Sequence, residues 1–216
     1  MPKQIAIIGL GKFGAALARE LKTLGHDVIG VDKSEKAVAE LESEIEHLLV
    51  FDSTSKQALE DSDIASSHIV VVAIGSGSEA SILTTLLLKE LGAKTVVAKA
   101  SGSYHAIILK RVGADRVIQP EEEMGRRLAR MLASPNTIDF IELAPGYSVV
   151  EIVPSSNMLG RTLTELDLRR RVGVNVLAIR RGDTVNAVPK GEDIVTKNDI
   201  LIVAGMDEGI DNLRKL

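Results

Sequence analysis

Residues 4–14 of the chain read QIAIIGLGKFG, and this stretch decides the fold. An almost wholly apolar run leads into Gly9, Gly11 and Gly14, and an amphipathic segment follows. The pattern is typical of a buried strand, a tight turn and a helix, in which glycines allow the turn, close approach of a ligand and close packing of helix on strand. The next apolar run ends at Asp32, where a carboxylate can accept hydrogen bonds from a ribose.

The alternation of short β-branched runs with amphipathic stretches continues over the first 120 residues. Strands are predicted at Gln4–Ile8, Asp27–Val31, His47–Phe51, His68–Ile74, Thr95–Ala98 and Arg116–Ile118. Helices are predicted at Phe13–Leu24, Glu35–Glu44, Ser55–Ser62, Glu79–Leu91 and His105–Val112. A regular β-α series of this kind predicts an α/β fold with a Rossmann-like, doubly wound parallel sheet.

The pattern changes after residue 120. A helix is predicted over Glu121–Ala133, and Ser134-Pro135-Asn136 breaks it. The rest of the chain predicts strands at Ser148–Val153, Val174–Arg181, Thr184–Val188 and Ile200–Ala204, with helices at Leu163–Arg171 and Asp207–Leu216. We therefore expect two domains, a nucleotide-binding domain at residues 1–134 and a small α+β domain at residues 135–216.

Composition excludes several classes of function. The 216 residues are 45% hydrophobic and only 2% aromatic, with a net charge of −4 and no cysteine. Stacking platforms for single-stranded nucleic acid, a basic DNA-binding surface and cysteine-based metal sites are therefore not expected, and we expect no nucleic-acid partner. The longest apolar run, Ile69–Ile74, has the length of a buried strand rather than a membrane span. The first predicted strand begins at residue 4, so we expect a cytoplasmic protein without a signal peptide.

The expected ligand is a nucleotide at the carboxyl edge of the sheet. The helix N-terminus after Gly11 would face the phosphates, and the Asp32 carboxylate would disfavour NADP relative to NAD, ATP or ADP. Asp52 and Ser53 follow the third strand and can meet the adenine, cap the next helix, or do both. Lys99 is either a phosphate partner or a surface lysine. The predicted cofactor-binding residues are Gly9, Gly11, Lys12, Phe13, Gly14, Asp32, Lys33, Asp52, Ser53, Ala73, Ile74, Gly75 and Lys99.

The sequence offers no obvious chemistry to perform on that nucleotide. Three of the four histidines, His26, His47 and His68, precede strands and so lie at the edge away from the ligand. Only His105 is near the right place to handle a proton. We therefore interpret the nucleotide as a signal. A soluble NAD-dependent oxidoreductase is the main alternative, and a nucleotide-sensing transcriptional regulator would need a basic winged helix that the sequence lacks.

Several stretches resemble one known family. The glycine pattern, Asp32 and the segments at residues 83–91 (LTTLLLKEL), 113–118 (GADRVI) and 120–121 (PE) are similar to the TrkA/KtrA family over the whole chain. These proteins are RCK (regulator of K⁺ conductance) subunits of bacterial potassium transporters. The resemblance is closest to KtrA-type subunits, which have one N-terminal and one C-terminal RCK domain.

This resemblance implies a non-enzymatic gating subunit. Family members form homodimers that assemble into an octameric ring beneath a membrane K⁺-translocating subunit of the KtrB or TrkH kind, and ATP, ADP or NAD(H) changes the shape of the ring. Lys12 stands where KtrA-like proteins have an arginine for the γ-phosphate, and it lacks the planar fork of arginine. Lys99 matches a phosphate-contacting lysine. Glu121 matches a glutamate that holds a cation (Mg²⁺ or Ca²⁺) at the dimer interface, although a glutamate here also complements the helix dipole.

The C-terminal domain carries arginines at residues 169–171 and 180–181, which predict either solvated charges or an anion site. The resemblance implies that this domain can bind cyclic di-AMP, with Arg169, Val176 and Pro189 near the matching positions. The same architecture can also serve an antiporter or another carrier, and the sequence leaves that alternative open.

Overall fold

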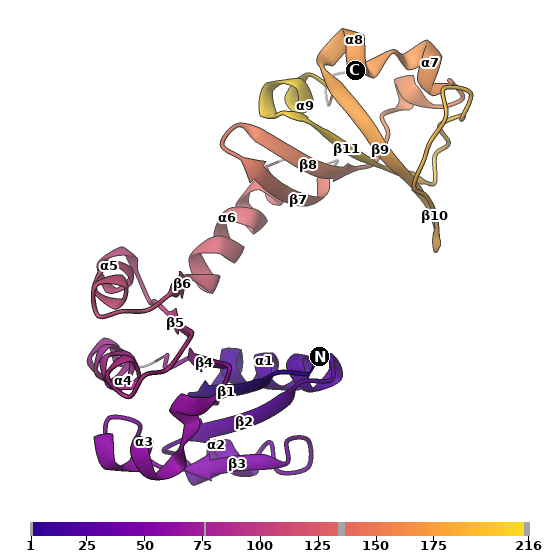
Figure 1. Cartoon of the computed structure of the whole chain (residues 1–216). Coiled ribbons are helices and arrows are strands. Elements are labelled where there is room, and N and C mark those ends of the chain that lie inside the picture. Colours follow the sequence, from indigo (N-terminus) through magenta and orange to yellow (C-terminus); the bar gives the residue numbers. More distant parts are fainter. Residues whose placement is uncertain (1, 76, 134–136, 214–216) are drawn as a thin grey trace. The chain divides into compact units, whose positions relative to one another are not determined.

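The structure is a computed structural model that describes residues 2–75, 77–133 and 137–213. It forms two compact units, Met1–Glu122 and Glu123–Leu216, which are described separately below (Figure 1). The break predicted at Ser134-Pro135-Asn136, and with it the predicted domain boundary between residues 134 and 135, lies outside the described residues.

The first unit is built on a six-stranded parallel sheet. Its strands are β1 (Gln4–Ile8), β2 (Asp27–Asp32), β3 (His47–Val50), β4 (Ile69–Val72), β5 (Val96–Lys99) and β6 (Arg116–Ile118). They lie in the order β3-β2-β1-β4-β5-β6, and every neighbouring pair is parallel. The order reverses between β1 and β4, the switch point at which such sheets bind ligands. The predicted Rossmann-like, doubly wound sheet is confirmed.

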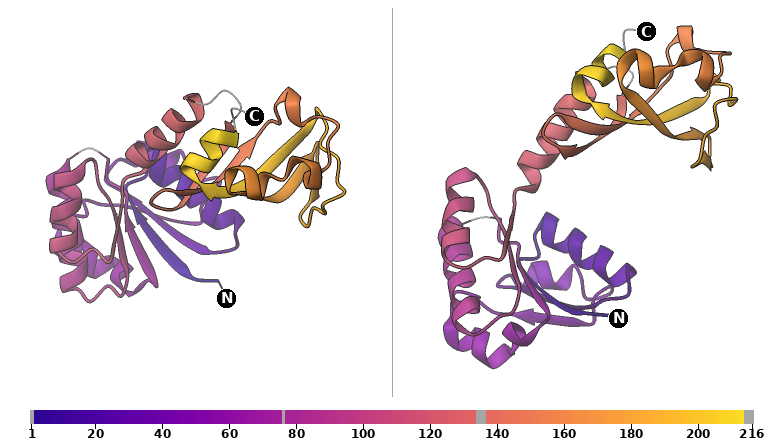
Figure 2. Two further views of the ribbon diagram at one scale, coloured as in Figure 1. Left: turned by 90° about the horizontal axis from the view of Figure 1, so that it is seen from above. Right: turned by 45° about the horizontal axis from the view of Figure 1, so that its top comes forward.

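Helices cover both faces of this sheet (Figure 2). They are α1 (Lys12–Thr23), α2 (Glu35–Ala39), α3 (Lys56–Ser62), α4 (Ser78–Glu90) and α5 (Ser103–Arg111). Leu59 of α3, Leu88 of α4 and Leu109 of α5 pack into the apolar layer on one face. Ala18 of α1 and Val38 of α2 pack into the layer on the other. Strands buried on both sides explain the nearly continuous apolar runs in the sequence.

The helix predicted at Glu35–Glu44 is shorter than expected, because α2 ends at Ala39. The chain continues in turns, in which Leu41 and Ile45 are still buried. Like charges four residues apart, such as Glu40 and Glu44, destabilise a helix, so the apolar pattern is satisfied here without helical continuation.

The second unit holds a five-stranded antiparallel sheet and several short helices. Its elements are α6 (Pro120–Leu132), whose first three residues belong to the first unit, β7 (Thr137–Ala144), β8 (Tyr147–Ile152), α7 (Leu163–Leu166), α8 (Leu168–Val172), β9 (Val174–Arg181), β10 (Thr184–Asn186), β11 (Asp199–Met206) and α9 (Asp207–Leu213). The strand order is β10-β9-β11-β8-β7. Residues of β8, β9 and β11 form an apolar core together with α7, α8 and α9, so the predicted small α+β domain is confirmed.

Two features of this unit differ from the sequence prediction. The strand β7 was not predicted, because its residues 137–144 (TIDFIELA) do not alternate cleanly and most of its side chains are exposed. The helix predicted at Leu163–Arg171 is two helices, α7 and α8. Asp167 separates them, with a left-handed backbone at φ +42°.

Candidate functional site

A cleft of about 260 Å³ opens at the carboxyl edge of the parallel sheet. It is lined by these predicted residues: Gly9, Gly11, Asp32, Lys33, Asp52, Ser53, Ala73, Ile74 and Gly75. Four further lining residues, Ile8, Phe51, Thr54 and Ala80, were not predicted. Phe51 and Thr54 flank a predicted pair at the end of the third strand, which is the signal that could have identified them.

The three glycines of the first turn have different roles. Gly9 has φ +98°, and a Cβ there would lie 2.9 Å from backbone atoms of Ala73 and Ile74. At Gly14 a Cβ would overlap the carbonyl oxygen of Gly9, so this glycine permits the contact of α1 with the turn. A Cβ on Gly11 would meet nothing within 4 Å. Gly11 therefore borders open space, where a ligand can approach the backbone, and it lines the cleft.

The Asp32 carboxylate at the end of β2 is held in place by two backbone amides. The N–H of Leu10 donates to Oδ2 at 2.7 Å, and the N–H of Ser34 donates to Oδ1 at 2.9 Å. Each carboxylate oxygen keeps a further lone pair toward the cleft. The side chain is thus oriented in advance to accept hydrogen bonds from a pair of hydroxyl groups.

Asp52 is held similarly after β3. Its Oδ1 accepts from the backbone N–H and the hydroxyl of Thr54 at 2.9 and 2.7 Å, which lowers the pKa of Asp52. Ser53 is buried, and its hydroxyl is hydrogen-bonded to Thr84. The N-cap of α3 is Ser55, so the alternative that Asp52 or Ser53 caps this helix is wrong. Oδ2 of Asp52 is thereby left to accept a hydrogen bond from a ligand amino group.

Lys99 lies at the end of β5 beside Gly75. The side chain is 10% exposed, so the alternative of a surface lysine is wrong. Its ammonium group pairs with Glu121 and lies 5.6 Å from the centre of the Phe13 ring. A Cβ on Gly75 would lie 4.0 Å from Nζ. Lys99 and Phe13 do not line the cleft themselves, but through Gly75 the ammonium is its close neighbour.

Lys12 is placed differently from the other predicted residues. It is exposed at the start of α1 and lines a separate groove between α1 and α2, together with Arg19 and Lys36. In this single chain Lys12 therefore does not reach the cleft that Asp32 lines.

Glu121 is in the first turn of α6, and its contact is the Lys99 ammonium. The hydrogen bond from Lys99 lowers the pKa of Glu121. Within the residues that the structure describes, no group of three or more His, Asp or Glu side chains could hold a metal ion. A cation at Glu121 would need ligands from elsewhere, such as phosphates or a second copy of the chain.

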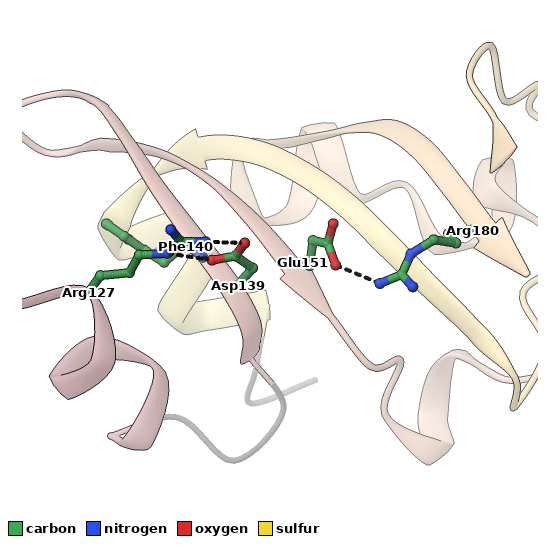
Figure 3. Close-up of polar contacts among 5 residues, drawn as sticks. All are labelled: Arg127, Asp139, Phe140, Glu151 and Arg180. Carbon is green, nitrogen blue, oxygen red and sulfur yellow. Dashed lines mark hydrogen bonds and ion pairs between the residues drawn. The ribbon is translucent and has the colours of Figure 1, made fainter. Parts of the chain in front are cut away.

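The arginines of the second unit do not form one cluster. Arg180 of β9 donates to Glu151 of β8 at 2.7 Å (Figure 3). Arg181 binds Asp199 through two hydrogen bonds of 2.7 and 3.0 Å. Each of these two charges is paired with a carboxylate of the chain, and the anion site at residues 180–181 stays a prediction.

The three residues predicted for the second ligand come from separate elements. Arg169 is exposed on α8, Val176 is half-buried on β9, and Pro189 follows β10. A cavity at the β9–β10 hairpin is lined by other residues, including Arg181, Asn186 and Asp193.

Comparison with known proteins identifies the family. The TrkA-N domain family matches residues 5–120, and the TrkA-C domain family matches residues 147–216. Ktr system potassium uptake protein C of Bacillus subtilis is 40% identical, over 100% of this chain and 97% of that protein. Ktr system potassium uptake protein A of the same organism is 36% identical, over 96% of this chain and 94% of that protein. The chain belongs to the TrkA/KtrA family.

Solved structures agree with this assignment of the TrkA/KtrA chain. The GsuK channel superposes with a TM-score of 0.72 at 19% identity, covering 100% of this chain and 39% of that one, which shows the shared fold. GsuK bound to ADP has a TM-score of 0.52 at 26% identity, covering 60% of this chain and 34% of that chain. This TrkA/KtrA chain thus spans less than half of those larger proteins. No helix among its described residues is long and apolar enough to cross a membrane.

The family assignment also decides against an enzyme. The relatives of this TrkA/KtrA chain are named as potassium uptake proteins, so the chain belongs to a family of potassium uptake proteins and is not an oxidoreductase. His105, the histidine closest to the expected position, is buried on α5 and does not line the cleft. The Nδ1 atom of His105 accepts from the backbone N–H of Ser101 at 3.2 Å, and burial lowers the pKa of the ring.

Proposed function

We propose that an adenine nucleotide (ATP, ADP or NAD(H)) binds in the cleft of the first unit and switches this chain between two states that a potassium-translocating membrane protein reads. The ribose hydroxyls would bind Asp32, the base would approach Asp52 and Phe51, and the phosphates would lie at the N-terminus of α1. A ligand can shift such an equilibrium only by its difference in affinity for the two states.

The observation that carries this proposal is the Asp32 carboxylate, which Leu10 and Ser34 fix in the lining of a cleft that Gly9, Gly11 and Gly75 also line. The N-cap of α1 is Gly11, and no side chain caps the helix. The first N–H groups of α1 can therefore donate hydrogen bonds to phosphate oxygens. The ADP-bound GsuK structure, at 26% identity over 60% of this chain, supports an adenine nucleotide as ligand.

The names of the Ktr relatives support the choice of system. We infer that the partner is a membrane K⁺-translocating subunit of the KtrB or TrkH kind, on whose cytoplasmic side this chain acts. The homodimer and the octameric ring implied by the sequence resemblance belong to the same proposal. In such an assembly Lys12 would reach a phosphate of the nucleotide bound to a second copy of the chain. The second copy would also add cation ligands beside Glu121.

Cyclic di-AMP is proposed as a second ligand of the C-terminal unit, at Arg169, Val176 and Pro189. This second proposal is supported by the sequence resemblance and by the exposure of Arg169 on α8. Mg²⁺ or Ca²⁺ at Glu121 is proposed on the same basis.

Thermal unfolding of the full chain with each ligand tests the proposal. A ligand that binds only the folded state stabilises it by RT ln(1 + [L]/Kd), about 2.7 kcal/mol at a ligand concentration of 100 Kd. We expect ADP, ATP or NADH to raise the midpoint, with NADPH less effective. Cyclic di-AMP, Mg²⁺ and Ca²⁺ are measured in the same series. If none of the adenine nucleotides raises the midpoint, the proposal is wrong.

Potassium flux tests the switch itself. The membrane subunit, reconstituted in vesicles with this chain, should conduct K⁺ at rates that differ between ATP and ADP. Equal flux with the two nucleotides, while both bind, would contradict nucleotide gating.

A further inference from the structure

The ammonium group of Lys99 lies beside one part of the cleft lining, at Gly75. The ammonium group is close to Gly75, which lines the cleft, and lies 5.6 Å from the ring of Phe13. Phe13 is in the first turn of α1, where the helix N-terminus attracts phosphate. Asp52 and Phe51 line the cleft at the end of another strand, β3. Lys99 therefore neighbours the part of the cleft that suits phosphates.

The environment of this ammonium group makes a counter-charge necessary. Only 10% of the Lys99 side chain is exposed, and a buried charge is costly unless an opposite charge compensates it. Glu121 supplies that charge from the first turn of α6, with a side chain that is itself 68% exposed. The partner is thus largely solvated and can be separated from Lys99 at little cost, since exposed carboxylates are well hydrated.

We propose that Glu121 and the phosphates of the bound nucleotide compete for the ammonium group of Lys99. This inference rests on the proposed function, because it requires a phosphate-bearing ligand in the cleft. In the structure Lys99 pairs with Glu121, and this pair ties the first turn of α6 to the end of β5. A ligand phosphate near Gly75 and α1 draws the ammonium away, and Glu121 is released from the pair.

The contacts of α6 give this competition a consequence. Further along the same helix, Arg127 binds Asp139 of β7 through two hydrogen bonds of 2.9 and 2.6 Å, drawn in Figure 3. Arg130 pairs with Glu142 of β7 at 3.2 Å. The helix whose first turn Glu121 holds is therefore the one bonded to the C-terminal sheet. Release of Glu121 changes how firmly the start of that helix is attached to the nucleotide-binding unit.

Two charge-removing variants on the same turn separate this role from a general effect of charge. Glu121→Gln removes the competitor of the phosphates, whereas Glu122→Gln removes an equal charge whose contact is the side chain of Gln119. Calorimetric titration of the full chain, in EDTA, compares adenosine, AMP, ADP and ATP. We expect Glu121→Gln to bind ADP and ATP about two- to fivefold more tightly, the small factor that suits a pair with one exposed partner. Adenosine affinity, and every affinity of Glu122→Gln, should match the unmodified protein.

A second readout follows the helix directly. Amide hydrogen exchange over residues 123–126, whose N–H groups follow the unpaired first turn of α6, should become faster when ADP binds the unmodified protein. In Glu121→Gln this exchange should already be fast and should not change with ADP.

Three outcomes overturn the inference. Unchanged or weaker ADP affinity in Glu121→Gln would show that Glu121 does not compete for Lys99. A loss of affinity that appears only when Mg²⁺ or Ca²⁺ replaces EDTA would instead assign Glu121 to a cation. Equal effects of both variants would reduce the result to general charge. Each of these leaves the proposed function intact if adenosine and ADP still bind, whereas failure of the unmodified chain to bind any of the four compounds would contradict the proposed function itself.

Discussion

The Arg181 guanidinium holds the Asp199 carboxylate through two hydrogen bonds, from Nε at 2.7 Å and from Nη2 at 3.0 Å. The Asp199 side chain is completely buried, and the backbone N–H of Thr196 donates a third hydrogen bond at 2.8 Å. A buried carboxylate with this many donors is stable as a charge, because charge-assisted hydrogen bonds replace the water it has lost. The pair joins β9 to the start of β11.

Asp199→Asn should destabilise the C-terminal unit. The amide cannot accept from Arg181 on both atoms, so one donor loses its partner and the charge of the pair is lost. We expect the free energy of unfolding to fall by about 1.5–3 kcal/mol, the contribution of a hydrogen bond to a charged group. Urea unfolding followed by circular dichroism measures this. Asp183→Asn, on the exposed hairpin, is the matched control, and an equal loss in both variants would contradict the role of the buried pair.

Because of the same Arg181–Asp199 pair, we expect the free energy of unfolding to fall at acid pH. Bonding to Arg181 lowers the pKa of Asp199 in the folded protein, so the unfolded state binds the proton more readily. The contribution of Asp199 is therefore fully present above its unfolded pKa of about 3.9 and is lost as the pH falls through the lower folded value. Below about pH 4, unfolding free energy should fall more steeply for the unmodified chain than for Asp199→Asn. Parallel curves for the two proteins would contradict the linkage.

Alanine substitutions at Gly11 and Gly14 should affect different properties. Gly14→Ala should mainly lower stability, and Gly11→Ala should mainly weaken ADP binding. A Cβ at Gly14 overlaps the carbonyl oxygen of Gly9, so Gly14→Ala should lower stability by about 3 kcal/mol. A Cβ at Gly11 meets no protein atom, so Gly11→Ala should cost less than about 1 kcal/mol. Because Gly11 lines the cleft where a ligand phosphate would approach the backbone, Gly11→Ala should still weaken ADP binding about tenfold or more, which is about 1.4 kcal/mol. Thermal unfolding and calorimetry separate the two effects, and normal ADP affinity in a stable Gly11→Ala would place the phosphates elsewhere.

Asp32→Ala should abolish most nucleotide binding but not the binding of a second ligand. Asp32 also accepts from Leu10 and Ser34, so the variant will be less stable by itself. The relevant quantity is therefore the increase in melting midpoint on adding ligand, not the midpoint. We expect the increase with ADP to disappear and any increase with cyclic di-AMP to remain. Loss of both would contradict two separate sites, and equal shifts of the unmodified chain with NADH and NADPH would contradict the role of the carboxylate.

The sequence predicted the first unit well because there the local and tertiary signals coincide. The apolar strands, the glycine turn and Asp32 follow one another in the order that the parallel sheet needs, so the cleft could be placed from the spacing. The hydrogen-bond partner of Ser53 could not be predicted in this way. The residue was predicted at the correct edge, but the hydroxyl binds Thr84 of α4, a contact between segments that the spacing does not connect.

The second unit was harder because the decisive contacts are between side chains distant in sequence. Arg180 and Arg181 are adjacent in the sequence, yet one is bonded to Glu151 and the other to Asp199. Adjacent side chains on a strand point to opposite faces, so these two neighbouring arginines meet different carboxylates. The strand β7 went unpredicted for a related reason. Its pairing with β8, rather than its own pattern, makes it a strand.

Arg169 and Arg180 differ in their surroundings, and we expect them to differ in their effect on cyclic di-AMP binding. Arg169 is exposed on α8, while the guanidinium of Arg180 donates to the carboxylate of Glu151 on β8. Arg169→Gln should therefore lower cyclic di-AMP affinity about tenfold or more, which is about 1.4 kcal/mol. Arg180→Gln, which removes the same charge from the same unit, should leave that affinity unchanged while it lowers the melting midpoint slightly. Calorimetric titration of both variants decides between a site built on Arg169 and a diffuse attraction of the whole unit for anions. Equal loss in the two variants, fading together as salt is added, would favour diffuse attraction, because long-range attraction between exposed charges is screened.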